Sequence, residues 1–237
     1  MNSKFTNTLF TALMALVFGF LGAAAWSYAG LADNRTRGYL VENPEILEEM
    51  FTELQTREAQ GRLAEVAGEI YTPFPGAVMG NPQGSRVLVE FTDYNCGYCE
   101  AATPDVARLI AEDPELKVVL REMPQFDGSE DAARWALAAA IQGKYSEFHQ
   151  RMFRMGPANA ATAEQVARDI GLDVERARAD AASEQVTAEL VRNFTMARVL
   201  GFNGTPGWVA GDTPVNGYIG YERMKAVLNE AGPALGG

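Results

Sequence analysis

The chain opens with a long apolar stretch, residues 9–21, inside a segment that carries no charge between Lys4 and Asp33. Small residues follow at positions 23–25. A positively charged start, an apolar stretch of this length and small residues at its end are typical of a secretory signal peptide. The uncharged segment is also long enough to cross a membrane. We therefore expect residues 1–32 to be a cleaved signal peptide or an uncleaved signal anchor, and the remainder to be exported to the periplasm or another extracytoplasmic space.

A second apolar pattern has helical spacing and follows a helix-start signal, in which Asn43 suits the N-cap and Pro44 the first turn. Its members form one stripe: Ile46, Leu47, Met50, Phe51 and Leu54. The stripe is compatible with a helix lying on the domain's own surface and with a self-association stalk whose stripe is buried between chains. We assign residues 33–70 to an N-terminal helical segment and residues 71–237 to the main domain.

The main domain begins with short apolar runs that predict strands. Runs at 86–92 and 116–122 read as buried strands, and the helical pattern at 100–111 between them contains Pro104. A strand, a helix and a second strand in this order predict a parallel βαβ unit. The run at 77–79, separated from residue 86 by an Asn-Pro-Gln-Gly turn, predicts an edge hairpin.

From residue 129 to about residue 200 every apolar pattern has helical spacing. The predicted helix starts are Ser129, Tyr145, Thr162 in a capping box with Gln165, Asp173 and Ser183. Strand patterns return at 208–210 and 215–218, and a closing helix is predicted over 221–230. The expected class is an α/β domain with a βαβ half, a helical insertion and a ββα half.

Composition and net charge exclude several classes of function. The 237 residues carry a net charge of −11, which argues against a nucleic-acid partner because phosphates would not be neutralised. The two cysteines, Cys96 and Cys99, exclude a scaffold held by several disulfides. Together with the single histidine, His149, they do not supply the four ligands of a closed zinc site. We expect no resident metal and no dissociable cofactor.

The Cys-x-x-Cys motif lies between a predicted strand and a predicted helix, and this position makes the motif a more specific signal. The sulfur of Cys96 then faces the positive end of the helix dipole, which favours the thiolate. Cys99, one turn later, can attack a mixed disulfide formed at Cys96. We therefore predict that Cys96 is the nucleophile and Cys99 the resolving thiol, in an oxidising compartment.

Three separated motifs, at 91–99, 121–124 and 204–206, resemble the DsbA-like branch of the thioredoxin superfamily. The resemblance covers residues 77–230 and implies a thioredoxin fold with a helical insertion at about 129–200. It also implies a cis bond before Pro206 and a Thr205 backbone that pairs with an extended substrate, beside Gly97 and Tyr98. Gly207 is smaller than the family's usual residue, which puts part of this contact in doubt.

The direction of the reaction is suggested by finer resemblances. The Cys-Gly-Tyr-Cys sequence and Thr205 are similar to periplasmic disulfide isomerases and reductases rather than to strong oxidases. Residues 39–46 resemble the N-terminal oligomerising helix of the copper-sensitivity-suppressor C proteins. The resemblance therefore implies a homo-oligomer formed through residues 39–54, in which several dithiols face one client and raise their local concentration.

Glu90, six residues before Cys96, has two interpretations. It is either a solvated carboxylate at a sheet edge or a buried acid that relays the proton of Cys99. The second is implied by the DsbA-like family, which carries a glutamate at this offset, and it requires a pKa raised by burial.

The leading hypothesis is an exported thiol–disulfide oxidoreductase that acts on cysteines of other exported proteins and is recycled by a membrane redox partner. A copper-binding or chaperone module with dithiols shared between subunits is the second hypothesis. A reductant dedicated to cytochrome c maturation is the third.

Overall fold

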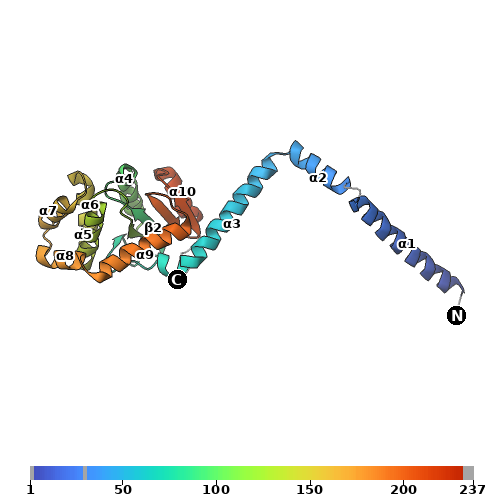
Figure 1. Ribbon diagram of the computed structural model, residues 1–237, viewed down its shortest axis with the longest axis horizontal. Helices are drawn as coiled ribbons and strands as arrows, with labels where there is room; N and C mark the ends of the chain where they lie inside the picture. Colours follow the sequence, from blue (N-terminus) through green and yellow to red (C-terminus); the bar gives the residue numbers. More distant parts are fainter. Residues whose placement is uncertain (1–2, 29–30, 232–237) are drawn as a thin grey trace. The chain divides into compact units, whose positions relative to one another are not determined.

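The computed structural model describes residues 3–28 and 31–231 and divides into two compact units, Met1–Gln55 and Thr56–Gly237. The first unit contains α1 (Ser3–Tyr28), α2 (Leu31–Glu42) and the start of α3 (Glu45–Ile70) (Figure 1). Within α1, residues Asn7–Tyr28 are long and apolar enough to cross a membrane, and none of this stretch is buried. A signal sequence has the same properties, so both interpretations of the leader stay open.

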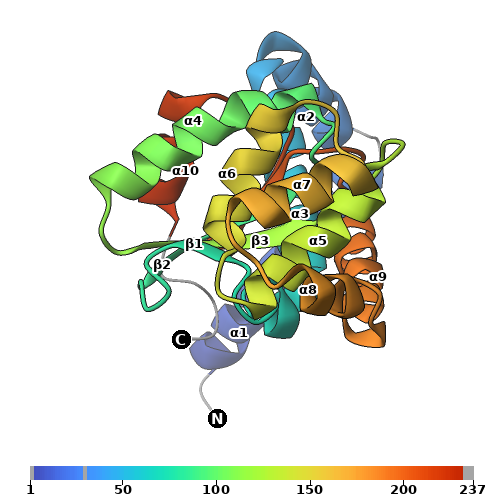
Figure 2. The same cartoon turned by 90° about the vertical axis from the view of Figure 1, so that its left-hand side faces the viewer.

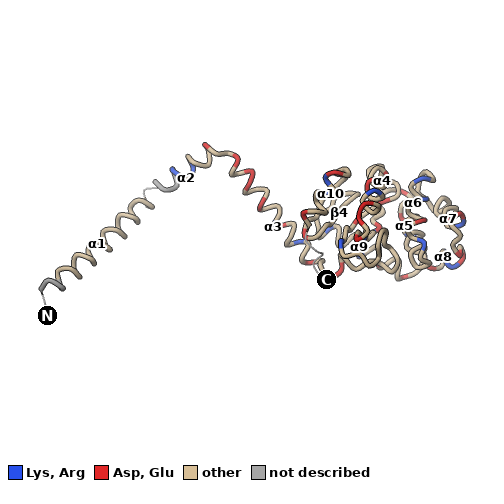
Figure 3. Tube along the Cα trace, turned by 180° about the vertical axis from the view of Figure 1, so that it is seen from behind, with Lys and Arg blue, Asp and Glu red and all other residues tan. Residues whose placement is uncertain are grey.

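Helix α3 begins where the Asn-Pro signal predicts and extends to Ile70. Four members of its apolar stripe are more than half exposed: Leu47, Met50, Phe51 and Leu54. Acidic residues recur along the same helix (Figure 3). Within the first unit the stripe is therefore uncovered, whereas the last turns of α3 belong to the second unit and bury Leu63, Val66 and Ile70.

In the described residues of the second unit, five strands form one sheet with the order β1-β3-β2-β4-β5. Their bounds are β1 Val78–Gly80, β2 Arg86–Thr92, β3 Leu116–Glu122, β4 Gly207–Ala210 and β5 Thr213–Asn216. Strands β2 and β3 are parallel and joined by α4 (Gly97–Glu112), which confirms the βαβ unit. The other neighbouring strands are antiparallel.

The predicted edge hairpin is wrong. Strand β1 pairs with β3, placing Val78 opposite Val119, and not with β2. The reason is that both edges of β2 are occupied, by β3 on one side and β4 on the other, so the free edge of β3 is where β1 can pair. The turn after β1 instead carries the chain across β3, and Asn81 donates its backbone N–H to the Leu116 carbonyl at 2.8 Å.

The sheet has a different apolar core on each face. On one face it packs against α4, the helical insertion and α10 (Tyr221–Glu230). On the other face it packs against the end of α3 and against α9 (Glu184–Leu200). Side chains alternate along β2, so Val89 and Phe91 enter the second core, whereas Leu88 enters the first. The same alternation turns Glu90 toward the face that α4 covers.

The insertion consists of helices that lie together beside the sheet (Figure 2). They are α5 (Ser129–Ile141), α6 (Tyr145–Met155), α7 (Ala160–Asp169) and α8 (Val174–Ala181), followed by α9. Asp173 and Ser183 cap α8 and α9 as predicted. Two predicted N-caps are wrong, because Asn159 caps α7 by accepting from the Thr162 N–H, and Gly128 is the N-cap of α5, whose first residue is Ser129.

A buried ion pair fastens the end of α3 to the sheet and to α9. Arg121 on β3 is 2% exposed and lies 2.9 Å from the carboxylate of Glu189. Its other amino group donates to the backbone carbonyls of Glu69, Ile70 and Thr72 at 2.5, 3.0 and 2.6 Å. Burial lowers the pKa of Arg121 and the charge of Glu189 opposes that shift. The contacts satisfy carbonyl groups that the helix end would otherwise leave unpaired.

Candidate active site

Cys96 is the N-cap residue of α4, at the junction that the sequence predicts. Its backbone is extended, with φ −88° and ψ 113°, and its carbonyl accepts the Glu100 N–H at 3.1 Å. The residue is 5% exposed. The thiol donates to the carbonyl oxygen of Thr205 at 3.2 Å, so residues 109 positions apart in the sequence meet here. The sulfur thus lies where the helix directs its positive end.

Cys99 lies one turn further along α4 and is fully buried. Both thiols are free in the structure. Burial, followed by the charge of Glu90, raises the pKa of Cys99 well above its ordinary value. Cys99 therefore holds its proton at neutral pH and must lose it before it can act as a nucleophile.

Glu90 on β2 is 2% exposed, so its interpretation as a solvated edge carboxylate is wrong. Burial raises the pKa of Glu90 to about 8. Glu90 lies on the face of the sheet that α4 covers, and its charge contributes to the raised pKa of Cys99. A carboxyl that titrates near neutral pH can exchange protons under physiological conditions.

The loop before β4 forms the other wall of the site. The Thr205–Pro206 peptide bond is cis, as the resemblance implies. The hydroxyl of Thr205 accepts from the Gln125 side chain at 3.4 Å, which joins this loop to the segment after β3. The glycine at position 207 has a steric reason, because a Cβ there would lie 2.7 Å from a ring carbon of Phe202.

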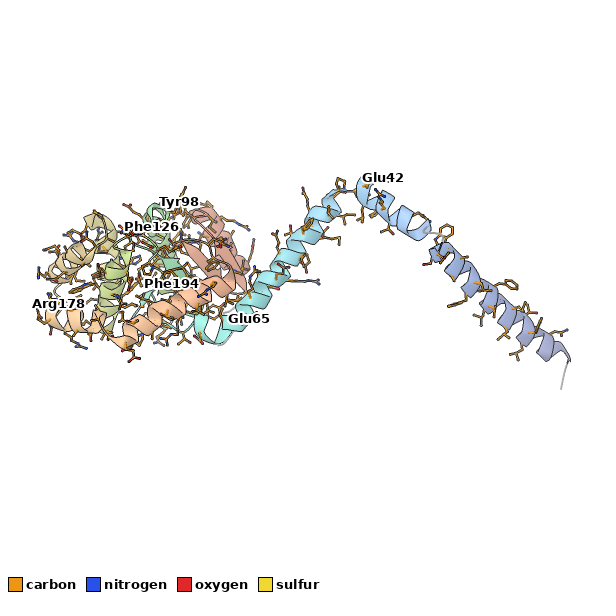
Figure 4. All side chains as sticks on the ribbon, in the orientation of Figure 1. Glu42, Glu65, Tyr98, Phe126, Arg178 and Phe194 are labelled. Atoms are coloured by element: carbon orange, nitrogen blue, oxygen red, sulfur yellow. The ribbon has the colours of Figure 1, made fainter. Side chains whose placement is uncertain are left out.

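Two exposed aromatic side chains belong to segments that form the site, Tyr98 to the first turn of α4 and Phe126 to the segment after β3. Tyr98 is 67% exposed and Phe126 is 51% exposed, and both lie at the same edge of the domain (Figure 4). The space beside Gly97 is open, since no atom lies within 4 Å of a Cβ built there. The sequence singles out Tyr98 by its place in the motif and misses Phe126, whose proximity depends on the Gln125–Thr205 contact.

A buried network of polar side chains behind the site could not be predicted from the sequence. Glu122, at the end of β3, accepts from the hydroxyls of Tyr94 at 3.1 Å and Tyr145 at 2.5 Å. The Tyr94 hydroxyl also lies 3.2 Å from Nδ1 of His149. Burial raises the pKa of Glu122 to about 8 and lowers the pKa of His149 to about 3. His149 is therefore a neutral packed residue.

Asp93 holds the loop that carries the nucleophile. Its buried carboxylate accepts from the backbone N–H of Asn95 at 2.7 Å and from the Ser129 hydroxyl at 2.5 Å. It also accepts from the N–H groups of Gln125 and Phe126 at 2.5 and 3.2 Å. The bond to Ser129 explains why that hydroxyl does not cap α5. An aspartate two residues before the N–H it binds is a known turn signal, so this role was open to sequence reasoning.

Among residues 3–28 and 31–231 there is no group of three or more histidine, cysteine, aspartate or glutamate side chains that could hold an ion.

Comparisons with known proteins agree with this geometry. Residues 74–230 match the family model described as thioredoxin, and residues 37–60 match the model for the N-terminal domain of copper resistance protein ScsC. The chain is 39% identical to a thioredoxin-like oxidoreductase from Silicibacter pomeroyi, covering 68% of this chain and 94% of that one, with a TM-score of 0.65.

Two further solved structures have the same fold. Proteus mirabilis ScsC in a transitional conformation is 27% identical over 82% of this chain and 92% of its own, with a TM-score of 0.65. The thiol-disulfide exchange protein alpha-DsbA2 from Wolbachia pipientis is 23% identical, covers 75% and 97%, and has a TM-score of 0.68.

Curated relatives are longer proteins. The Na(+)/H(+) antiporter NhaA of Herminiimonas arsenicoxydans is 30% identical over 155 residues, which are 64% of this chain and 25% of the antiporter. The chain thus spans about a quarter of the length of the curated relatives it matches.

Proposed function

The chain belongs to the thioredoxin family, with the features of DsbA-like oxidoreductases of the ScsC type, and from this we propose that it exchanges disulfides in exported proteins through Cys96 and Cys99. The observation that carries the proposal is the placement of Cys96. The nucleophile is the N-cap of α4, beside the Thr205 carbonyl, with Cys99 buried one turn behind it.

The reaction follows from this placement. The Cys96 thiolate attacks a client disulfide, forms a mixed disulfide and releases one client thiolate. The ionised fraction of Glu90, a minor one at pH 7 because burial raises its pKa to about 8, then takes the proton of Cys99, and Cys99 attacks the sulfur of Cys96 and releases the second client thiolate. The client is reduced by two electrons and the Cys96–Cys99 pair is oxidised, and the reverse sequence introduces a disulfide. Because the electrons reside in the dithiol, no dissociable cofactor is needed.

Client binding is assigned to the surface around the dithiol. Thr205 and Pro206 would lie along an extended client segment, and Gly97 leaves room for it to approach Cys96. Tyr98 and Phe126 supply exposed aromatic surface of the kind enriched where proteins bind one another. We assign the natural substrates to proteins with accessible disulfides rather than to one small metabolite.

Isomerase or reductase activity is the direction we favour over net oxidation. Support comes from the Gly97–Tyr98 dipeptide, from Thr205 and from the match of residues 37–60 to the ScsC N-terminal domain. We propose that residues 39–54 join chains through the uncovered apolar stripe. Several dithiols would then act on one misfolded client.

Export is proposed from α1, whose apolar stretch can serve as a signal or an anchor. An exported dithiol needs a source or sink of electrons, and we assign this role to a membrane redox partner. Sodium–proton exchange is not carried over from the antiporters, because the match covers a quarter of their length.

The experiment combines an insulin-reduction assay with refolding of scrambled ribonuclease. Wild-type protein is expected to catalyse both, and Cys96→Ala to lose both, because the first covalent step is removed. Equal activity of the two proteins would refute the proposal. Oxidation of reduced ribonuclease in the same preparation separates net oxidase from isomerase activity.

A copper-handling module is the second candidate, favoured by the match to a copper resistance protein. Two dithiols from neighbouring chains would hold the ion, since thiolates are soft ligands that select copper(I). Reduced protein would then co-purify with one copper per two or more chains. Metal-free protein with full dithiol reactivity would count against it.

A further inference from the structure

A cavity of about 760 Å³ opens beside Cys96 on the side of the helical insertion. It lies between the loop before α4, the first turn of α4 and the end of α6. Its principal lining residues are Tyr94, Cys96, Glu100, Phe153, Arg154 and Pro157. Thr205 and Pro206 are not among the lining residues, so the cavity lies apart from the loop before β4 and shares only Cys96 and Gly97 with the surface assigned to client proteins. Its volume is within the range of small-molecule sites.

The wall of the cavity is fastened by Asn95, the residue before the nucleophile. The Ala158 N–H donates to the Asn95 side-chain oxygen at 2.7 Å, and the Asn95 amide donates back to the Ala158 carbonyl at 2.9 Å. The same amide donates to the Asp127 carbonyl at 2.9 Å. The loop of the dithiol and the loop after α6 are therefore held together by reciprocal bonds, which keeps the cavity in one shape.

The floor is aromatic and immobilised. The rings of Tyr94 and Phe153 have centroids 4.9 Å apart, and both residues are more than nine-tenths buried. The Tyr94 hydroxyl is engaged with Glu122 and His149. The face that lines the cavity is consequently apolar and suits the methylene groups of a small ligand.

The sides carry one charge of each sign. Glu100 lies in the first turn of α4 and Arg154 in the last turn of α6, and both are exposed. In the described part of the chain neither side chain takes part in an ion pair. The cavity thus presents an acceptor for an ammonium group and a bidentate donor for a carboxylate, together with the reactive sulfur.

We propose that this cavity binds a low-molecular-weight disulfide or thiol of the amino-acid or small-peptide class. Its carboxylate pairs with Arg154, its ammonium with Glu100, and its methylene groups lie on Tyr94 and Phe153. An internal segment of a protein has neither a free ammonium nor a free carboxylate on its backbone, whereas such a thiol has both near its sulfur. The proposal rests on the proposed function, because the bound sulfur reacts with Cys96.

The reaction balances with the bound disulfide as the oxidant. The Cys96 thiolate attacks one sulfur of the small disulfide, its S–S bond breaks, and one small thiolate leaves and takes a proton from solvent. Cys99 gives up its proton and displaces the second small thiolate from Cys96. The products are two small thiols and the Cys96–Cys99 disulfide, so two electrons pass from the protein to the ligand.

The test compares two small disulfides on the reduced full chain. Glutathione disulfide carries ammonium and carboxylate groups, whereas hydroxyethyl disulfide is uncharged. Arg154→Glu is expected to slow oxidation by glutathione disulfide about fivefold, the upper range for one exposed ion pair, and to change the rate with hydroxyethyl disulfide less than about twofold. Glu100→Lys is expected to act in the same direction. Arg223→Glu on α10 makes the same charge change away from the cavity and serves as the control.

Three outcomes would overturn the proposal. Equal slowing with both disulfides would show that Arg154 acts on Cys96 rather than on the ligand. Unchanged glutathione kinetics with slower exchange on scrambled ribonuclease would assign the cavity to protein clients. A wild-type protein that reacts with neither disulfide and does not act on scrambled ribonuclease would refute both the proposed function and this inference. The charge variants test the inference alone, because they leave Cys96 and Cys99 in place.

Discussion

At the scale of single residues, the site combines one reactive thiol with groups that hold protons. Cys96 lies at a helix N-terminus, whereas Cys99 and Glu90 are buried behind it. The cysteines were predictable because four consecutive residues carry the motif and a strand precedes it. Glu122 and Tyr145 were not, because their contact arises only when α6 packs over the end of β3.

Glu90→Gln tests the proton relay. A glutamine cannot take the proton of Cys99, so the resolution step is expected to slow by roughly tenfold or more, while the first attack by Cys96 stays within about twofold. Acid quenching and mass spectrometry would detect an accumulating mixed disulfide. Glu147→Gln, an exposed carboxyl on α6, is the control. Unchanged resolution at pH 7 would remove Glu90 from the mechanism.

Glu122→Gln tests the buried carboxyl through stability. Burial raises the folded-state pKa of Glu122 to about 8 from its ordinary value of 4.5, so the folded protein keeps a proton that the unfolded chain releases. The free energy of unfolding therefore falls as pH rises from about 5 to 8, by up to about 1.4 kcal/mol per pH unit for this group. The amide variant lacks this titration, so its stability relative to wild type should rise over the same window in urea denaturation. A difference independent of pH would contradict the assignment.

At the scale of elements, periodicity predicted the helices better than it predicted how strands pair. Helices α8 and α9 begin at the expected caps, and α10 has the expected bounds. Strand β1 was assigned to the wrong neighbour because pairing depends on which sheet edges remain free, and a local turn signal does not contain that information. The start of α7 was misplaced because two polar residues, Asn159 and Thr162, both suit an N-cap.

The two caps of α7 can be distinguished by mutation. Asn159→Ala removes the acceptor of the Thr162 N–H and is expected to lower the free energy of unfolding by about 1 kcal/mol. Thr162→Ala keeps the backbone N–H and is expected to cost less than half as much. Urea denaturation of both variants checks the order, and the reverse order would restore the predicted capping box.

At the scale of the whole molecule, the chain contains a thioredoxin domain and an N-terminal unit with a different composition. The exchange reaction proposed above needs only residues of this domain. The N-terminal unit presents apolar side chains that its own helices leave uncovered. The proposed oligomer would cover this stripe, with a second copy of α3 as the partner surface.

Phe51→Glu tests this association. Wild-type residues 33–237 are expected to have a native mass of a multiple of one chain, and the variant the mass of a single chain, because a charge in the stripe opposes burial between helices. Glu49→Ala, outside the stripe, is the control. The single-chain variant should have lower isomerase activity than the wild type but should still reduce insulin. A monomeric wild-type protein would refute association through residues 39–54.

The protons held by Glu90 and Glu122 also alter the charge that the folded molecule carries. The sequence gives −11, with every carboxyl ionised, but two carboxyls with a pKa of about 8 are mostly neutral at pH 7, which leaves about −9. The folded protein should therefore migrate more slowly toward the anode at pH 7 than a mobility calculated from its composition. Raising the buffer above pH 9 should remove the difference between the measured and the calculated mobility. Electrophoresis would therefore show how many buried carboxyls hold a proton, without a spectroscopic probe.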